Sequence, residues 1–309
     1  MKNQYFGDIN DYRKYGILRG LGGKGTLSTA VCWTLTPDDS RSDGSRIRYL
    51  SEPSEWSRYD PELFAHLRLT VIGRRVRAVE AIQDARVLPN SRFFDEVLTD
   101  NVAERKRYFD RFLRFARGTD LVFFDPDNGL GVKSVERGER NSSKYVYDEE
   151  LAVAFRDGHS VLFYQHFPRR PRGPFVQGLV ERLAPALGAT EAYSFSTSMV
   201  VFLLFVHRRH YSMLESRAVE VEAKWGGQMR VAKHSQESVA EPWGAVAVSA
   251  EIPSRAIKQA TLWTSLSAMS ASCPIGPEPM QSAPIRDESR PRVHIRDPPP
   301  CSGTALSRP

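Results

Sequence analysis

The spacing of hydrophobic positions changes repeatedly between a helical and a strand-like period along the first two thirds of the chain. Helical spacing predicts helices near residues 12–21, 61–71, 102–117, 148–156 and 175–187. Apolar and β-branched runs predict strands at residues 31–36, 47–50, 92–95, 120–125, 160–165, 191–196 and 199–206. Helices therefore separate most of the strands, but the last two strands follow each other directly.

The strands at residues 120–125 and 160–165 are almost continuously apolar, which is typical of strands buried on both faces of a parallel sheet. A short Ser/Thr turn separates residues 191–196 from 199–206, so these two strands are expected to form an antiparallel hairpin. The pattern predicts an α/β fold with a doubly wound, mostly parallel sheet and an antiparallel terminal strand.

The composition changes near the end of the chain. Of the 20 prolines, 11 lie at or beyond Pro242, in a stretch that mixes Pro, Ser and Arg without apolar periodicity. Such a composition does not bury enough apolar area to offset the entropy of ordering. We expect residues 1–235 to form one α/β domain and residues 236–309 to form a disordered Pro/Ser/Arg-rich tail.

The remaining composition excludes several classes of protein. No window approaches the 18 or so apolar residues needed to cross a bilayer, so a membrane protein is not expected. Three cysteines, of which only Cys32 lies in the expected core, do not make a disulfide scaffold, and a reducing cytoplasm is the expected location. The formal net charge of +6 and the pI of about 9.3 permit contact with nucleic acid without requiring it. The oligomeric state is not predicted.

Polar residues follow the strand at residues 120–125. The segment Asp125-Pro126-Asp127-Asn128-Gly129 begins where this strand ends. In open α/β sheets, ligands bind beyond the carboxyl ends of the strands, so Asp125, Asp127 and Asn128 are candidate catalytic residues. The alternative interpretation is a simple turn that Asp125 caps.

A second polar cluster follows the strand at residues 160–165. Gln165 and His166 are further candidate catalytic residues, and Tyr164 and Phe167 are aromatic rings that could stack on a base. Three arginines follow them and could hold phosphate groups: Arg169, Arg170 and Arg172. The alternative is a solvated surface loop. His207 and His210 are interpreted as surface residues.

The loop after the first strand is the third candidate site. It runs from Thr34 to Gly44 and contains Thr36, and its acidic residues Asp38, Asp39 and Asp43 could bind an ammonium group or a divalent cation. A solvated acidic loop is the alternative.

Two segments carry a resemblance to known proteins. Residues 7–19, which read Gly-Asp-Ile-Asn-Asp-Tyr-Arg-Lys-Tyr-Gly-Ile-Leu-Arg, resemble a group of uncharacterised bacterial proteins, together with Asp125–Gly129 and Tyr164–His166. That group is distantly similar to S-adenosylmethionine-dependent methyltransferases with an Asp-Pro-Pro-Tyr motif, particularly the ribosomal-RNA adenine-N6 enzymes. Those enzymes carry an N-terminal Asp-x-x-Lys-His helix, which Asp11, Lys14 and Tyr15 match with tyrosine in the histidine position.

The resemblance implies a class I methyltransferase-like fold and a function: transfer of a methyl group from S-adenosylmethionine to an amino group, in nucleic acid. It implies that the cofactor contacts Lys14 and the first-strand loop at Thr36, Asp38, Asp43 and Gly44. It also implies that Asp125 accepts a hydrogen bond from the amine. Asp127 and Asn128 replace the second proline and the aromatic residue of the motif, so base stacking would have to come from Tyr164 or Phe167.

Two other functions remain open from the residues alone. Asp125 and Asp127, with Asp38, Asp39 or Asp43, could complete a magnesium site in a nuclease or phosphoesterase. Alternatively, a non-catalytic relative could hold nucleic acid through the basic helix at residues 102–117 and the arginines at 169–172.

Overall fold

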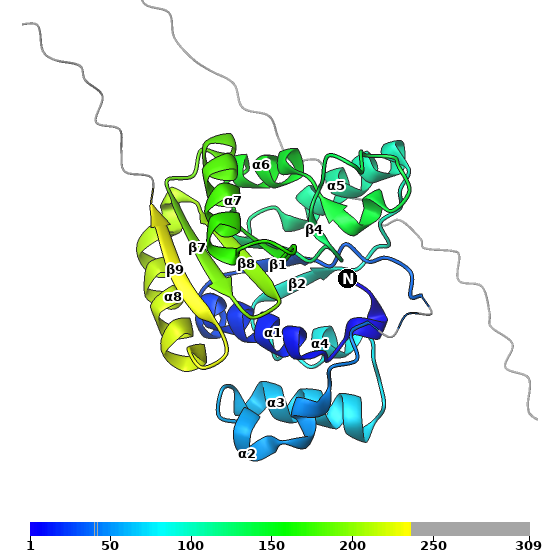
Figure 1. Cartoon of the computed structure of the whole chain (residues 1–309), viewed down its shortest axis with the longest axis vertical. Coiled ribbons are helices and arrows are strands. Elements are labelled where there is room, and N and C mark those ends of the chain that lie inside the picture. Colours follow the sequence, from blue (N-terminus) through cyan, green and yellow to red (C-terminus); the bar gives the residue numbers. More distant parts are fainter. Residues whose placement is uncertain (40, 42, 236–309) are drawn as a thin grey trace, which may run out of the picture. The chain divides into compact units, whose positions relative to one another are not determined.

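The computed structural model describes residues 1–39, 41 and 43–235 (Figure 1). The predicted tail, residues 236–309, lies outside the described residues. No helix in the described part of the chain is long and apolar enough to cross a membrane.

The described residues form a seven-stranded sheet in the order β2-β1-β3-β6-β8-β7-β9. Its strands are β1 (Thr29–Cys32), β2 (Ser91–Phe94), β3 (Leu121–Phe124), β6 (Ser160–His166), β7 (Glu191–Ser196), β8 (Val200–Val206) and β9 (Arg230–Ser235). The first four strands of the order are parallel, whereas β8 is antiparallel to β6 and β7, and β9 is antiparallel to β7. Five of these seven strands therefore point the same way. A separate two-stranded parallel sheet consists of β4 (Gly129–Leu130) and β5 (Tyr145–Val146).

Helices cover both faces of this sheet (Figure 1). Their bounds are α1 (Ile9–Gly22), α2 (Pro53–Trp56), α3 (Pro61–Arg68), α4 (Glu80–Asp84), α5 (Val102–Ala116), α6 (Asp148–Arg156), α7 (Arg172–Leu187) and α8 (Tyr211–Trp225). Residues of α1, α3 and α8 belong to the core on one face, and residues of α5, α6 and α7 to the core on the other. The sheet is doubly wound, in the manner of Rossmann-like α/β folds.

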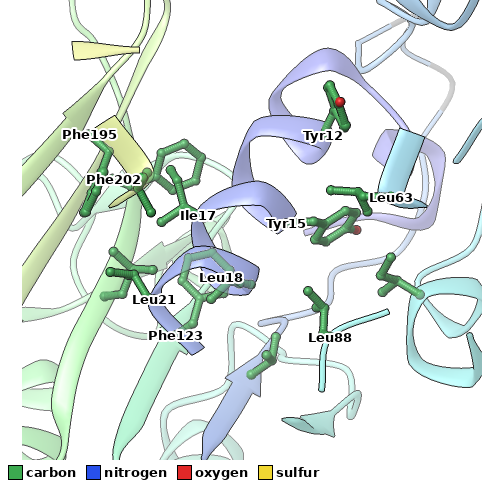
Figure 2. Packing of buried hydrophobic residues seen from close by; sticks show 14 of the residues in the cluster. Tyr12, Tyr15, Ile17, Leu18, Leu21, Leu63, Leu88, Phe123, Phe195 and Phe202 are labelled. Atoms are coloured by element: carbon green, nitrogen blue, oxygen red, sulfur yellow. The ribbon is translucent and has the colours of Figure 1, made fainter. Parts of the chain in front are cut away.

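The pleat of the strands divides their side chains between the two cores, because successive residues of a strand point to opposite faces. Phe123 lies in the core with α1, and Phe124 lies in the core with α5. Figure 2 shows the first core, where Ile17, Leu18 and Leu21 of α1 lie near Phe123 and the phenylalanines of β7 and β8. The nearly continuous apolar character of these strands follows from this two-sided burial.

The structure differs from the sequence-based expectation in four elements. Residues 47–50 do not form a strand, because the chain turns through a 3₁₀ helix at Arg48–Ser51 that buries Tyr49 and Leu50 together. The antiparallel hairpin strand β8 lies inside the sheet, between β6 and β7, and the edge strand is β9, which α8 brings beside β7. Neither α8 nor β9 was predicted, although Leu214, Ala218, Val221 and Trp225 have helical spacing and are all buried.

His210 also differs from its interpretation as a surface residue, since it is buried. The Ser160 hydroxyl accepts a hydrogen bond from the His207 backbone N–H at 2.9 Å and lies 2.9 Å from His210 Nδ1. These contacts join the start of β6 to the segment that leads into α8.

Candidate functional site

A cavity of about 560 Å³ opens at the carboxyl ends of β1, β3 and β6. Its walls come from α1, residues 41 and 43–46 after β1, residues 125–128 after β3, and the end of β6. The chain reaches β2 on one side of β1 and β3 on the other, so β1 and β3 flank the point where the strand order reverses. Ligands of open α/β sheets bind in the crevice at such a point.

The geometry at the end of β3 places two carboxylates at this cavity. The Asp125 backbone N–H donates to the Cys32 carbonyl at 3.0 Å, which extends the pairing of β3 with β1 by one residue. Asp125 and Asp127 are both buried, and both line the cavity together with Pro126 and Asn128. The three candidate catalytic residues of this segment therefore lie at one wall.

Lys14 connects α1 to this wall. Its ammonium group lies 2.7 Å from Asp11 Oδ1 and 2.6 Å from Asp125 Oδ2, and all three side chains are buried. Asp11 and Lys14 are three residues apart, so they lie on the same face of the helix, and Asp8 precedes them on that face. The opposite charges compensate one another in a region that water reaches poorly.

Burial and the neighbouring charges change the acid–base properties of this cluster. Burial raises the pKa of Asp11 to about 6, and the Asp125 carboxylate adds to the rise although Lys14 opposes it. Burial alone would lower the pKa of Lys14, but the carboxylates of Asp11 and Asp125 outweigh it and leave that pKa above its ordinary value. Lys14 is therefore a permanent cation, whereas Asp11 titrates near neutrality.

Asp127 is held by two further groups. Thr36 Oγ1 donates to Asp127 Oδ2 at 2.9 Å, and the α-amino group of Met1 lies 2.7 Å from Asp127 Oδ1. The same amino group donates to the Asp125 carbonyl at 2.8 Å. Thr36 does not line the cavity, and acts through Asp127 instead of facing a ligand.

The end of β6 presents alternate side chains to the cavity. Tyr164 and His166 line it, and the Tyr164 hydroxyl lies 3.0 Å from His166 Nε2. Burial raises the pKa of Tyr164 well above its ordinary value. Burial and the positive charge of Arg46 lower the pKa of His166. Both side chains are neutral at pH 7 as a result.

Gln165 does not line the cavity, contrary to its assignment as a candidate catalytic residue. Residue alternation along β6 points it to the other side, where its Oε1 accepts from the Leu130 N–H at 2.8 Å and its Nε2 donates to the His166 carbonyl at 2.7 Å. A Cβ at Gly129, whose φ is +109°, would lie 2.4 Å from Gln165 Oε1. The amide therefore packs on this glycine and positions the loop after β3.

The first-strand loop divides into two parts. Asp43 and Gly44 line the cavity, whereas Asp38 and Asp39 lie outside it. Asp38 Oδ1 accepts from the Gln4 N–H at 3.1 Å, and Asp39 pairs with Lys2, which lowers the pKa of that carboxyl to about 2. Asp38, a candidate cofactor-binding residue, therefore lies outside this cavity, where the N-terminal segment contacts its side chain.

The loop begins with strained backbone. Thr34 is buried and has a φ of +45°, a conformation that β-branched residues rarely adopt. Its hydroxyl donates to the Trp33 carbonyl at 2.7 Å. Strain of this kind is concentrated at ligand sites, and here it lies between β1 and the loop residues that line the cavity.

The three candidate arginines lie beside a second, open cavity of about 440 Å³. We name this space the arginine pocket; its polar and aromatic walls are Phe167, Arg169, Arg170, Arg172 and Ser198, and Met199 lines both cavities. The Arg172 guanidinium lies 5.5 Å from the centre of the Phe167 ring. Phe167 thus belongs to the arginine pocket, whereas Tyr164 and Tyr5 line the main cavity.

Sequence reasoning missed several residues at the main cavity. They are Tyr5, Asp8, Asn10, Ser45, Arg46 and Lys144. The spacing of Asp8, Asp11 and Lys14 along one helix face was a usable signal, but nothing in the sequence places Lys144 beside Asn128. That neighbourhood depends on the hydrogen bond from the Asn128 N–H to the Lys144 carbonyl at 2.9 Å.

The acidic residues do not form a metal site. Within the residues that the structure describes, no three His, Cys, Asp or Glu side chains come together as metal ligands. Lys14 occupies one oxygen of Asp125, and Thr36 and the Met1 amino group occupy Asp127. The donor set suits a cationic organic group better than a magnesium ion that needs several free oxygens.

No protein-family model matches the chain, and no curated protein matches it. Among solved structures it is similar to the crystal structure of protein LPL1258 from Legionella pneumophila, described as belonging to family DUF519. The two share 10% sequence identity with a TM-score of 0.40, over 75% of this chain and 98% of that one. This likeness is distant and says nothing about the activity of the chain.

Proposed function

We propose that the main cavity binds S-adenosylmethionine and that the protein transfers its methyl group to an amino group in nucleic acid. The observation that carries the proposal is the meeting of Asp125, Pro126 and Tyr164 at one cavity, at the reversal point of a doubly wound sheet. The hairpin strand β8 agrees with the antiparallel strand that the resemblance to class I methyltransferases implies.

The cavity has the size and charge for such a ligand. Its volume lies within the range of about 300–1,000 Å³ that is usual for small-molecule sites. Its lining combines the carboxylates of Asp8, Asp11, Asp43, Asp125 and Asp127 with the cationic groups of Lys14, Arg41, Arg46, Lys144 and the Met1 amino group, which suits a ligand that carries charges of both signs. When bound, S-adenosylmethionine supplies an electrophilic methyl group on a positively charged sulfur, and carboxylates stabilise such a charge.

The residues of the chain would then position the acceptor. Asp125 accepts a hydrogen bond from the amino group and keeps its lone pair directed at the methyl carbon. As the nitrogen–carbon bond forms and the carbon–sulfur bond breaks, the displaced electron pair stays on sulfur and the amine loses a proton to Asp125 or to water. Tyr164 stacks on the base, in place of the aromatic residue that Asn128 replaces. Such a reaction needs orientation more than a strong base.

Calorimetric titration with S-adenosylmethionine tests the cofactor assignment. Asp43→Asn should weaken binding because it removes a carboxylate at the cavity, whereas Asp38→Asn, in the same loop but outside the cavity, should not. Equal effects of the two variants, or no binding to the unmodified protein, would contradict the proposal.

A transfer assay tests the catalytic assignment. With labelled S-adenosylmethionine and total RNA or DNA, Asp125→Asn should lower methyl transfer far more than cofactor affinity, because the amide oxygen is a weaker hydrogen-bond acceptor than a carboxylate and cannot take up the proton of the amine. Asp110→Asn, on the exposed side of α5, is the matched control. If magnesium raises the melting temperature, Asp125→Asn removes that effect and S-adenosylmethionine does not bind, the metal-dependent phosphoesterase is the better function.

A further inference from the structure

Met199 stands between the two cavities described above. Its side chain is 46% exposed and lines both the main cavity and the arginine pocket. It lies in the turn between β7 and β8, outside the three segments at which the sequence predicted a site. An isolated exposed methionine needs no explanation by itself, but its position between a cavity of mixed charge and a basic pocket does.

The backbone around Met199 is held firmly. Thr197 Oγ1 accepts from the backbone N–H groups of Met199 at 3.2 Å and Val200 at 3.0 Å. The Thr197 N–H donates to the Val200 carbonyl at 2.8 Å, and the Met199 carbonyl accepts from the Phe167 N–H at 3.1 Å. These bonds tie the turn to β8 on one side and to the end of β6 on the other, so little backbone entropy is lost when the side chain contacts a ligand.

The arginine pocket has the chemistry for phosphate. In the described part of the chain, Arg169, Arg170 and Arg172 make no ion pair with a carboxylate. Guanidinium groups bind phosphate through paired hydrogen bonds, and Phe167 offers a ring beside them. In the main cavity, by contrast, Lys14, Arg46 and the Met1 amino group are paired with carboxylates, which leaves the guanidinium groups of the arginine pocket as the better site for phosphate.

We propose that Met199 is a wedge that separates the nucleotide whose base enters the main cavity from its neighbour, whose phosphate lies in the arginine pocket. This inference rests on the proposed function, and names Met199 as a positioning residue for the nucleic acid. An enzyme that modifies a base must take it out of the stack. Apolar side chains, methionine among them, do this by inserting between base steps.

Fluorescence of 2-aminopurine, which increases when the base leaves the stack, tests the wedge. The probes are RNA and DNA duplexes containing one 2-aminopurine, and the corresponding single strands of about twelve nucleotides, within the usual range of single-strand site sizes. The full chain should increase the emission of one or both duplexes. Comparison of the two duplexes distinguishes RNA from DNA as the partner.

Four variants distinguish the apolar role of Met199 from the charge of the arginines. The Met199→Ala protein should no longer increase the emission. It should bind the duplex about five- to tenfold more weakly, the loss seen when a side chain that stacks on a base is removed. It should bind the single strand as before. Met199→Leu should restore the increase, because leucine keeps the apolar volume. Arg169→Ala with Arg170→Ala should weaken binding of both probes and reduce its salt dependence. Met213→Ala, at a similarly exposed methionine of α8, is the control.

The outcomes are distinct from those of the proposed function. If Met199→Ala increases the emission as the unmodified protein does, or if Met213→Ala is equally impaired, Met199 is not a wedge, even if methyl transfer occurs. Absence of any emission increase or oligonucleotide binding at low salt also overturns the inference. If unstacking depends on Met199 but S-adenosylmethionine does not bind, the wedge stands and the methyltransferase proposal fails.

Discussion

The Lys14 ammonium group lies 2.6 Å from Asp125 Oδ2, although 111 residues separate the two in the chain. Because Asp11 lies on the other side of the same ammonium group, one buried cation compensates two buried carboxylates. Helix α1 and the end of β3 are therefore joined by charge at the cavity as well as by packing.

Replacing Lys14 by methionine should destabilise the fold by about 3–5 kcal/mol, the usual cost of leaving a buried charge without its partner. Urea unfolding measures the loss. Lys106→Met is the matched control, because that lysine is 80% exposed and its surface ion pair contributes little. Adding Asp11→Asn to Lys14→Met should recover part of the stability, and a double variant less stable than Lys14→Met would contradict the proposed compensation.

The raised pKa of Asp11 predicts a pH dependence of cofactor binding. This carboxyl is charged above about pH 6 and neutral below it, so the cavity lining loses one negative charge as the pH falls through that value. The charged groups that face it are Lys14, Asp125 and Asp8. Affinity for S-adenosylmethionine should fall in this range, and calorimetry at several pH values measures it. Asp11→Asn should flatten the profile, whereas an unchanged profile in that variant would assign the titration to another group.

Two helical glycines differ in the space beside them, and alanine substitutions should therefore have opposite effects on stability. A Cβ at Gly16 would lie 2.1 Å from Cζ2 of Trp225, whereas a Cβ at Gly178 in α7 meets nothing within 4 Å. Gly16→Ala should destabilise the fold by about 1–3 kcal/mol through overpacking. Gly178→Ala should stabilise it by about 0.5–1 kcal/mol through helix propensity. Thermal unfolding measures both, and a stable Gly16→Ala protein would mean that α8 packs elsewhere.

Two buried histidines predict a loss of stability in mild acid. Burial lowers the pKa of His159 and of His210 in the folded protein, whereas the unfolded chain titrates near the ordinary value of about 6.5. Above about pH 6.5 both histidines are neutral in the folded and the unfolded protein, and the fold keeps its full stability. As the pH falls from there toward the lower pKa values of the folded protein, the unfolded chain binds more protons than the folded one, so the free energy of unfolding decreases. Urea unfolding above and below pH 6.5 should show the decrease. His210→Gln should reduce the slope, and the same slope in that variant argues against the contribution of His210.

Much of the fold was determined by the sequence itself, because a side chain's preference for burial repeats with the period of its own element. The continuous apolar runs around Phe123 and Phe163 place those strands in the middle of a sheet with both faces covered. The same periodicity was present in α8, where Leu214 and Trp225 belong to a helical pattern that was not predicted. At residues 47–50 the local pattern was misleading, since two adjacent apolar side chains are buried together by a turn.

The candidate site was determined only in part by the sequence. Asp125 and Asp127 follow a buried strand, and the topology of parallel strands brings such ends to one edge of the sheet. Only the tertiary structure decided which neighbouring side chains face the cavity: Gln165 points away through the pleat of β6, and Asp38 is taken up by Gln4. The pairing of Lys14 with Asp125 and the position of Met199 between two cavities also required the fold, because both join segments that are distant in the chain and whose approach is set by packing.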